Sequence, residues 1–147
     1  MNNLLSNIDF DDIFKKDSFY GGTYCKDQLK NSKIEDKFYV INLEDSDKGK
    51  GTHWTMCYNV RKNINIYFDS MGIEPNEDIK KFMRKAKKKM ACTDIQIQNL
   101  NSDSCGHFTL YMIEQLNTGR LLTDIIFTDF DINNTNKNDM VRKVVEI

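Results

Sequence analysis

The sequence predicts a single α+β domain that spans residues 1–147. Two alternating apolar runs, His53 to Val60 and Ile64 to Asp69, are typical of strands. Apolar side chains recur at helical spacing from Asn76 to Met90 and from Gly106 to Asn117. A chain of 147 residues is long enough to bury a core and too short for two ordinary domains.

The composition excludes several classes of protein. Charged residues make up 29% and hydrophobic residues 39% of the chain, which is typical of a soluble globular protein. No apolar run approaches the roughly 20 residues that a membrane span needs. Residues Met1 to Asp12 lack the basic start and the apolar stretch of a secretory signal. We therefore expect a protein that has no membrane partner and is not secreted.

The cysteines and histidines do not form a metal-binding pattern. The four cysteines are widely spaced without a C-x-x-C pair, and only two histidines accompany them. We therefore expect no metal and no cofactor. In a reducing compartment each thiol is either a small buried hydrophobe or a reactive group. The four are Cys25, Cys57, Cys92 and Cys105.

The elements before the alternating runs are short. Asp9 to Lys16 predicts a short helix, Gly21-Gly22 a turn, and Lys26 to Leu29 another helical stretch. Lys37 to Leu43 is rich in β-branched and aromatic residues and predicts a buried strand. The polar stretch from Glu44 to Gly51 predicts a loop.

The two alternating runs predict a hairpin with one register. Their apolar faces coincide in only one pairing, because a slip of one residue turns one set to the wrong side. The predicted pairs are Val60 with Ile64, Tyr58 with Ile66 and Met56 with Phe68. In that register His53 and Asp69 are diagonal neighbours, about 7–8 Å apart at the backbone. The hairpin alone can therefore build a His–Asp pair.

The second half of the chain predicts two helices and a short strand. Asn76 can cap a helix that continues to Met90, and Thr93 to Gln98 predicts a strand that leads into a polar loop. Gly106 to Asn117 predicts a largely buried helix. The pattern from Leu121 to Ile147 predicts an acidic-aromatic turn, an Asn-rich loop and a terminal helix near Met140 to Val145.

Cys105 stands where a nucleophilic thiol is expected. A thiol attacks as thiolate, which a helix N-terminus and a charged imidazole both stabilise. Cys105 follows the polar loop from Asn99 to Ser104 and opens the hydrophobic helix. The alternative is a buried structural cysteine, since free cysteines usually have no reactive role.

His53 is the better of the two possible bases. His107 lies two residues into the Cys105 helix, and residues two apart point away from one another. The alternative for His53 is an ordinary strand histidine. Asp69 either orients the imidazole or hydrogen-bonds the turn from Ser70 to Gly72, which is a common role for Asp.

An enzyme that transfers an acyl group also needs donors for the developing oxyanion. A glutamine side chain and the backbone N–H of the nucleophile can provide them. Gln96 and Gln98 both stand just before the loop that leads to Cys105. For either glutamine the alternative is a solvent-facing strand residue.

Three strings of the sequence resemble those of adenain, the adenovirus maturation protease. They are GTHW at Gly51 to Trp54, FDSMG at Phe68 to Gly72 and QNLNSDSCG at Gln98 to Gly106. The strings also resemble those of ubiquitin-like-protein deconjugases and of proteases from virophages and large DNA viruses. The resemblance runs from near Phe19 to about Asn117, roughly two thirds of the chain.

This resemblance implies a papain-like cysteine protease fold, with a central mixed or antiparallel sheet packed against the helix that bears the nucleophile. By position it assigns the base to His53, the orienting acid to Asp69, the oxyanion donor to Gln98 and the nucleophile to Cys105. It also implies that Trp54 and Gly106 bind substrate, since in this family the tryptophan borders a narrow channel that passes only glycine side chains.

The spacing favours the viral branch of this group. Six residues separate Gln98 from Cys105, as in adenain. In the deconjugases the corresponding glutamine and cysteine are separated by one residue fewer. Adenain has Glu where this chain has Asp69, yet either carboxylate can hold the imidazole. Adenain is also larger and strongly basic, whereas this chain has a net charge of −1. The stimulation of adenain by DNA and a viral peptide is therefore not carried over.

The resemblance implies hydrolysis of viral capsid or core precursor proteins through a thioester, after Gly-x or Gly-Gly sequences. The reaction is then expected in the virion or the infected cell. Two alternatives stay open. One is an isopeptidase that removes ubiquitin-like modifiers, and the other is a non-catalytic virion component that keeps the fold.

A basic cluster follows Asn76 and could track a nucleic-acid backbone. The alternative is a solvated helix face, since no aromatic side chains are interleaved with the charges. The cluster consists of Lys80, Lys81, Arg84, Lys85, Lys87, Lys88 and Lys89.

Overall fold

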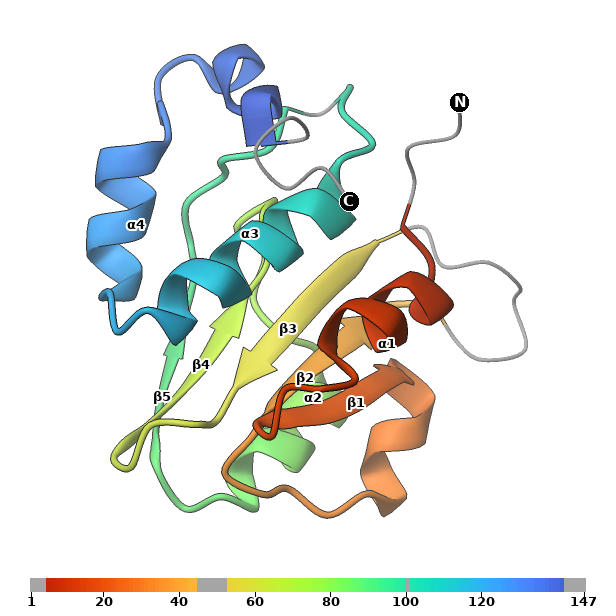
Figure 1. Ribbon diagram of the computed structural model, residues 1–147. Coiled ribbons are helices and arrows are strands. Elements are labelled where there is room, and N and C mark those ends of the chain that lie inside the picture. The colour runs from red at the N-terminus through yellow and green to blue at the C-terminus, as the bar shows by residue number, and fades with distance from the viewer. Residues whose placement is uncertain (1–4, 45–52, 100, 142–147) are drawn as a thin grey trace.

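The computed structural model describes residues 5–44, 53–99 and 101–141, which form a five-stranded sheet with helices on both faces (Figure 1). This is the α+β class that the sequence predicts. In chain order the elements are α1 (Asn7–Phe14), β1 (Tyr20–Cys25), the 3-10 helix η1 (Lys26–Asn31), β2 (Phe38–Asn42), β3 (Trp54–Tyr58), β4 (Ile64–Phe68), α2 (Glu77–Arg84), β5 (Lys89–Cys92), α3 (Cys105–Asn117), α4 (Leu122–Asp129) and the 3-10 helix η2 (Thr135–Met140).

The sheet is mixed, and its strands lie in sequence order from β1 to β5. β3 is antiparallel to both β2 and β4, whereas β1 pairs with β2 and β5 pairs with β4 in parallel. A parallel neighbour requires a crossover connection. η1 lies in the first crossover and α2 in the second. Both pack on one face, because Leu29 of η1 and Phe82 of α2 belong to the same hydrophobic cluster.

Two hydrophobic clusters cover the two faces of the sheet. Trp54 and Tyr58 of β3 point into a cluster that α1, α3 and α4 complete. Cys57 of β3 and Tyr39 of β2 point into the opposite cluster, where the Tyr39 ring packs edge-on against Phe82 at 5.1 Å. Figure 1 shows α1 and α3 in front of the sheet and α2 behind it. The central strand β3 is therefore buried on both sides.

The hairpin has the predicted register. Met56 pairs with Phe68 and Tyr58 pairs with Ile66 across β3 and β4. The buried helix is also confirmed, and α3 begins one residue before the predicted start, at Cys105. The hairpin therefore positions His53 and Asp69, and the start of α3 positions Cys105.

The helix predicted from Asn76 to Met90 is too long. Asn76 does cap it, since its side chain accepts a hydrogen bond from the backbone N–H of Ile79, but α2 ends at Arg84. Lys87 has a φ of 56°. This left-handed backbone turns the chain into β5, so Met90 lies in an edge strand that pairs with β4.

The strand predicted from Thr93 to Gln98 is wrong. The backbone N–H groups of Ile97 and Gln98 both donate to the carbonyl of Ser70, and no strand ladder forms. The apolar side chain of Ile97 still packs into the core, where it is fully buried. The segment follows the end of β4 as an irregular extended chain.

The turn predicted at Gly21-Gly22 is also wrong, because both glycines lie within β1. A Cβ at Gly21 would lie 2.3 Å from the Tyr39 ring of the neighbouring strand. The glycine therefore makes room for the Tyr39 ring.

The turn predicted after Leu121 is replaced by α4. Ile125 and Ile126 are buried on this helix, and they join the cluster that contains α3. Residues 45–51 of the predicted loop and residues 142–145 of the predicted terminal helix lie outside the described part of the chain.

Candidate active site

The hairpin brings His53 and Asp69 into contact. His53 immediately precedes β3 and Asp69 immediately follows β4, so the observed register places them side by side. His53 Nε2 and Asp69 Oδ1 lie 2.8 Å apart. The His53 side chain is 21% exposed and the Asp69 side chain is fully buried. The pair therefore opens to solvent only through the imidazole ring.

Asp69 is fixed on several sides. Its Oδ1 also accepts a hydrogen bond from the backbone N–H of Met71 at 2.8 Å. Its own backbone N–H donates to Thr93 Oγ1 at 2.9 Å. The orienting contact and the turn contact are thus made by the same oxygen. Asp69 Oδ2 is buried and has no hydrogen-bond partner among the described residues.

Cys105 lies beside the start of β3. Its Sγ accepts a hydrogen bond from the backbone N–H of Trp54 at 3.4 Å. Thr109, one turn along α3, donates to the carbonyls of both Cys105 and Trp54 through Oγ1. Strand and helix are therefore tied together next to the thiol. His107, which the sequence predicts to be poorly placed as a base, is buried on the same helix.

The His53 imidazole is coupled to both neighbours. Burial of the ring has the largest single effect and lowers the pKa of His53. The hydrogen bonds to Asp69 and Cys105, together with the charges of these groups, outweigh burial and raise the pKa of His53 to about 9. The environment of the ring therefore favours the imidazolium, the form that stabilises a neighbouring thiolate.

Gln98 is buried in the segment that leads to Cys105. Its Oε1 accepts a hydrogen bond from Ser70 Oγ at 2.5 Å, and its Nε2 donates to the carbonyl of Ser102 at 2.8 Å. An amide nitrogen carries two hydrogens, so one remains for a further acceptor. Gln96 is only half-buried and donates from Nε2 to the Gln98 carbonyl at 2.8 Å.

The two residues predicted to bind substrate, Trp54 and Gly106, both contact Leu5, which the sequence analysis did not identify. Trp54 and Gly106 are both buried. The Trp54 indole N–H donates to the Leu5 carbonyl at 3.0 Å. A Cβ at Gly106 would lie 3.1 Å from Leu5 Cβ and 3.3 Å from Trp54 Cδ1. The one available signal was the apolar residue in front of a capping box, Ser6 with Asp9.

The C-terminal part of the chain also supports the site. Asn138 of η2 donates from Nδ2 to the carbonyl of Ile97 at 2.8 Å. Ser102 Oγ donates to Asp139 Oδ1 at 2.7 Å. η2 therefore holds the segment that carries Gln98, a role that an Asn-rich stretch does not signal in the sequence.

Burial affects the thiols of Cys57 and Cys92. Cys57 is fully buried and donates to Asn65 Oδ1, and burial raises its pKa. Burial also raises the pKa of Cys92 on β5. A raised pKa keeps a thiol protonated and weakly nucleophilic. Within the described ranges, no group of three His, Cys, Asp or Glu side chains is arranged to hold a metal ion.

Several side chains of the basic cluster make contacts within the protein. Lys88 Nζ pairs with Asp36 at 2.7 Å and donates to two backbone carbonyls. Lys85 Nζ donates to the carbonyls of Lys30 and Ser32. Arg84 and Lys80 lie within ion-pair distance of Glu77. These contacts occupy part of the cluster within the protein, and Lys87, Lys88 and Lys89 lie beyond the end of α2, so the cluster does not form a single helix face.

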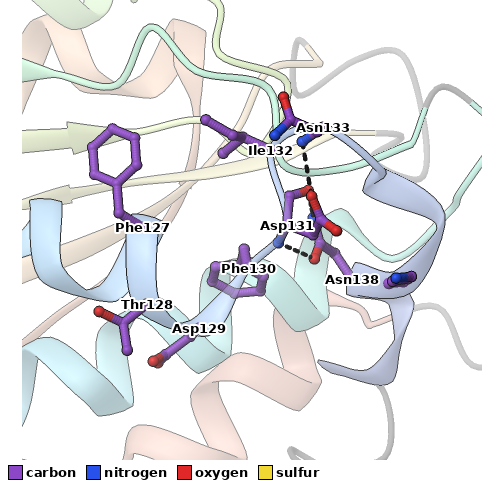
Figure 2. A pocket seen from close by; sticks show the side chains of 9 residues that line it. Phe127, Thr128, Asp129, Phe130, Asp131, Ile132, Asn133 and Asn138 are labelled. Carbon is purple, nitrogen blue, oxygen red and sulfur yellow. Dashed lines mark hydrogen bonds between the residues drawn. The ribbon is translucent and has the colours of Figure 1, made fainter.

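A separate pocket lies between α4 and η2, and Figure 2 shows the side chains that line it. Asn138 Oδ1 accepts from the Asp131 N–H, and Asp131 Oδ1 accepts from the Asn133 N–H. These polar groups stabilise the loop itself. Neither His53 nor Cys105 lines this pocket, so we do not assign the chemistry to it.

No protein-family model matches the sequence, and no curated protein matches it either. Solved structures do match the fold. A crystal structure of the ASFV pS273R protease superposes with a TM-score of 0.70 and 18% sequence identity, covering 99% of this chain and 69% of that chain. Its selenomethionine form superposes with a TM-score of 0.62 and 18% identity, covering 99% and 70%. The chain therefore shares the α+β fold of the ASFV pS273R protease, the fold class that the resemblance implied.

No helix in the described residues is both long and apolar enough to cross a membrane.

Proposed function

We propose that this chain is a cysteine endopeptidase that cleaves viral capsid or core precursor proteins after small residues. One observation carries the proposal. The His53 ring hydrogen-bonds the buried Asp69 carboxylate, and the neighbouring Cys105 thiol also raises the pKa of His53. An acid, an imidazole and a thiol in that sequence form the arrangement that activates a nucleophile. The fold shared with the ASFV pS273R protease supports the same conclusion.

In the proposed reaction His53 accepts the thiol proton through Nδ1, because Nε2 is held by Asp69. The Cys105 sulfur attacks the scissile carbonyl carbon. The imidazolium then protonates the amine as the C–N bond breaks, which leaves a thioester. His53 next takes a proton from water, and the hydroxide oxygen attacks the thioester. The carboxylic acid leaves, and the proton returns to sulfur.

The oxyanion of the tetrahedral intermediate is assigned to two donors. One is the backbone N–H of Cys105, in the first turn of α3, where the helix dipole favours a negative charge. The other is the second amide hydrogen of Gln98, whose first hydrogen binds Ser102. The bond from Ser70 to Gln98 Oε1 fixes which way the amide faces. Such fixed donors are effective because they need no reorganisation.

The proposed substrate class rests on the resemblance to adenain-type proteases, in which the tryptophan at the position of Trp54 borders a channel that passes only glycine side chains. In this chain Trp54 follows the base and Gly106 follows the nucleophile, and a Cβ at Gly106 would lie 3.3 Å from Trp54 Cδ1. Gly-x and Gly-Gly sequences fit this description. The natural substrates we propose are viral precursor proteins, processed in the virion or the infected cell.

The isopeptidase alternative uses the same catalytic groups and differs in the partner surface. A ubiquitin-like protein with a reactive C-terminal probe separates the two functions, because only a deconjugase binds the folded modifier. We do not extend the proposal to nucleic acid, because Lys85 and Lys88 are occupied by contacts within the protein.

The proposal is tested by incubating the chain with a panel of Gly-containing peptides and comparing it with Cys105→Ala. Cleavage is expected for the unmodified chain and none for Cys105→Ala, since the variant lacks the sulfur that forms the thioester. Cys92→Ala is the matched control, because Cys92 is an exposed cysteine on the edge strand β5. Cleavage that persists in Cys105→Ala excludes the mechanism, and a chain without cleavage or Cys105 labelling is a non-catalytic component.

A further inference from the structure

Leu5 lies against the residues that follow the base and the nucleophile. Its carbonyl accepts the Trp54 indole N–H at 3.0 Å. Its side chain is near enough to Gly106 that an added Cβ there would be 3.1 Å from Leu5 Cβ and 3.3 Å from Leu5 Cδ1. Trp54 follows His53 and Gly106 follows Cys105, so Leu5 contacts the residue next to the base and the residue next to the nucleophile.

Leu5 is held in this place by local structure. Ser6 caps α1 in a reciprocal capping box, in which the Ser6 N–H donates to Asp9 Oδ2 at 2.8 Å and the Asp9 N–H donates to Ser6 Oγ at 3.3 Å. Leu5 and Phe10 occupy the two positions of a hydrophobic staple around this cap. Phe10 in turn packs edge-on against Trp54 with 5.0 Å between ring centroids.

Leu5 is also only partly buried, so one side of it remains available to a ligand. A fixed, half-exposed side chain that contacts Trp54 and Gly106 limits the space that a bound substrate has beside these two residues. A loosely attached segment would instead lack the cap and the indole hydrogen bond.

We propose that Leu5 is a specificity-determining residue that limits the size of the substrate side chain next to the scissile bond. This rests on the proposed peptidase function. Glycine passes the wall formed by Leu5 and Trp54, and a β-branched side chain collides with it. The substrate class is therefore set by a residue before α1 as well as by the segments that carry the catalytic groups.

The test compares Leu5→Ala with the unmodified chain in two assays. The first uses peptides that differ only in Gly, Ala or Val before the scissile bond. We expect the ratio of kcat/KM for Val to that for Gly to rise about tenfold in Leu5→Ala, the scale of one or two methylene groups in a pocket. Leu5→Val keeps more of the packing and should give a smaller rise. Ile8→Ala is the control, because Ile8 is 66% exposed on α1.

The second assay needs no peptide hydrolysis. Cys105 is alkylated with iodoacetamide or with the bulkier 2-iodopropanamide, and Leu5→Ala is expected to speed only the bulkier reagent. Equal ratios in both proteins would show that Leu5 only packs. A parallel rise with all reagents and peptides would instead identify a plug that blocks the site. Size-selective alkylation without hydrolysis keeps the wall and refutes the peptidase function.

Discussion

At the scale of single residues, the proposed chemistry depends on the His53 imidazole, which lies between the Asp69 carboxylate and the Cys105 thiol. Asp69 is fully buried and held by the turn that follows it, so it cannot move away from the ring. The His53 ring keeps 21% of its side-chain surface exposed, so its other nitrogen can exchange a proton. Burial alone would favour the neutral ring, and the contacts with Asp69 and Cys105 reverse that preference.

The pKa of His53 gives a prediction with a definite sign. It is raised from 6.5 to about 9 in the folded chain, so the protonated ring stabilises the fold. That contribution is complete below about 6.5 and is lost as the pH rises through about 9. An NMR titration of the His53 ring should give a midpoint near 9. A midpoint below the ordinary value would contradict the assigned contacts.

Asp69→Asn tests the source of that shift. The amide can still accept from His53 but carries no charge, so the pKa of His53 is expected to fall. Peptidase kcat should drop by roughly 10²–10⁴-fold, because the imidazolium loses its stabilising anion. Unfolding by denaturant should also show a loss of about 1–3 kcal/mol, since the amide nitrogen would replace the buried Oδ2 without an acceptor. Unchanged kinetics in a folded Asp69→Asn would leave Asp69 a turn residue alone.

Residues with a local signal could be predicted, and others could not. The contact of His53 with Asp69 follows from the alternation of two strands, because register decides which side chains meet. Cys105 follows from the start of an apolar helix. Leu5 reaches the site across 49 residues of sequence through the Trp54 indole. The spacing of apolar residues along the sequence cannot predict such a long-range contact.

At the scale of elements, the segment between β5 and α3 has no regular structure and depends on its neighbours. Gly72 has a φ of 73°, and a Cβ there would lie 2.7 Å from the Ile95 carbonyl carbon. The turn after β4 therefore lets the segment approach closely. Asn138 of η2 holds it from the other side through the Ile97 carbonyl. The sequence shows alternation here but not these partners, which explains the incorrect strand prediction.

The same reasoning explains the length of α2. Apolar spacing continues beyond Arg84 to Met90, but Met90 is half-buried on β5 beside Asn65 of β4. Periodicity cannot distinguish a helix from an edge strand over so few residues. The choice depends on pairing with a strand that lies more than twenty residues earlier.

The oxyanion donor is best tested on this segment, with Gln98 and Gln96 as a matched pair. Gln98→Ala should lower kcat by about 10²–10³-fold, typical of losing one such donor. Gln96→Ala should have a small effect, because the Gln96 amide donates to the backbone carbonyl of Gln98 and not to its side chain. Alkylation by iodoacetamide passes through no oxyanion and should be unchanged in both, which separates this role from a displaced Cys105.

A large defect in Gln96→Ala with a trivial one in Gln98→Ala would reverse the assignment. Slower alkylation in Gln98→Ala would show that Ser70 and Ser102 lose their partner and that the segment moves. In that case Gln98 is a positioning residue.

At the scale of the whole molecule, the sheet separates two hydrophobic cores, of which one contains Cys105 and the other contains the crossover elements. The site lies where β3 begins and β4 ends, and Cys105 belongs to the core that α1 and α3 cover. The opposite core, beneath η1 and α2, holds the crossovers that complete the sheet. Both cores contribute to stability, but only the first positions the thiol.

Two phenylalanines, one in each core, can distinguish the effect of a core on stability from its effect on the position of the thiol. Phe82 of α2 and Phe108 of α3 are both fully buried, one in each core. Each contacts one other ring, at 5.1 Å for Phe82 with Tyr39 and 5.6 Å for Phe108 with Phe130. Replacing either with Ala should cost about 3–5 kcal/mol of the free energy of unfolding, because each leaves a cavity of the same kind.

Their effects on chemistry should differ. Phe108 lies three residues along α3 from Cys105, so relaxation of the helix into the cavity shifts the thiol from the Trp54 N–H and slows alkylation. Phe82→Ala relaxes the opposite face and should leave the alkylation rate of the folded molecules unchanged. Denaturant unfolding gives the folded fraction of each variant, and the rate is divided by it. If Phe82→Ala slows alkylation as much as Phe108→Ala does, the sheet transmits strain between its faces and the two cores do not act separately.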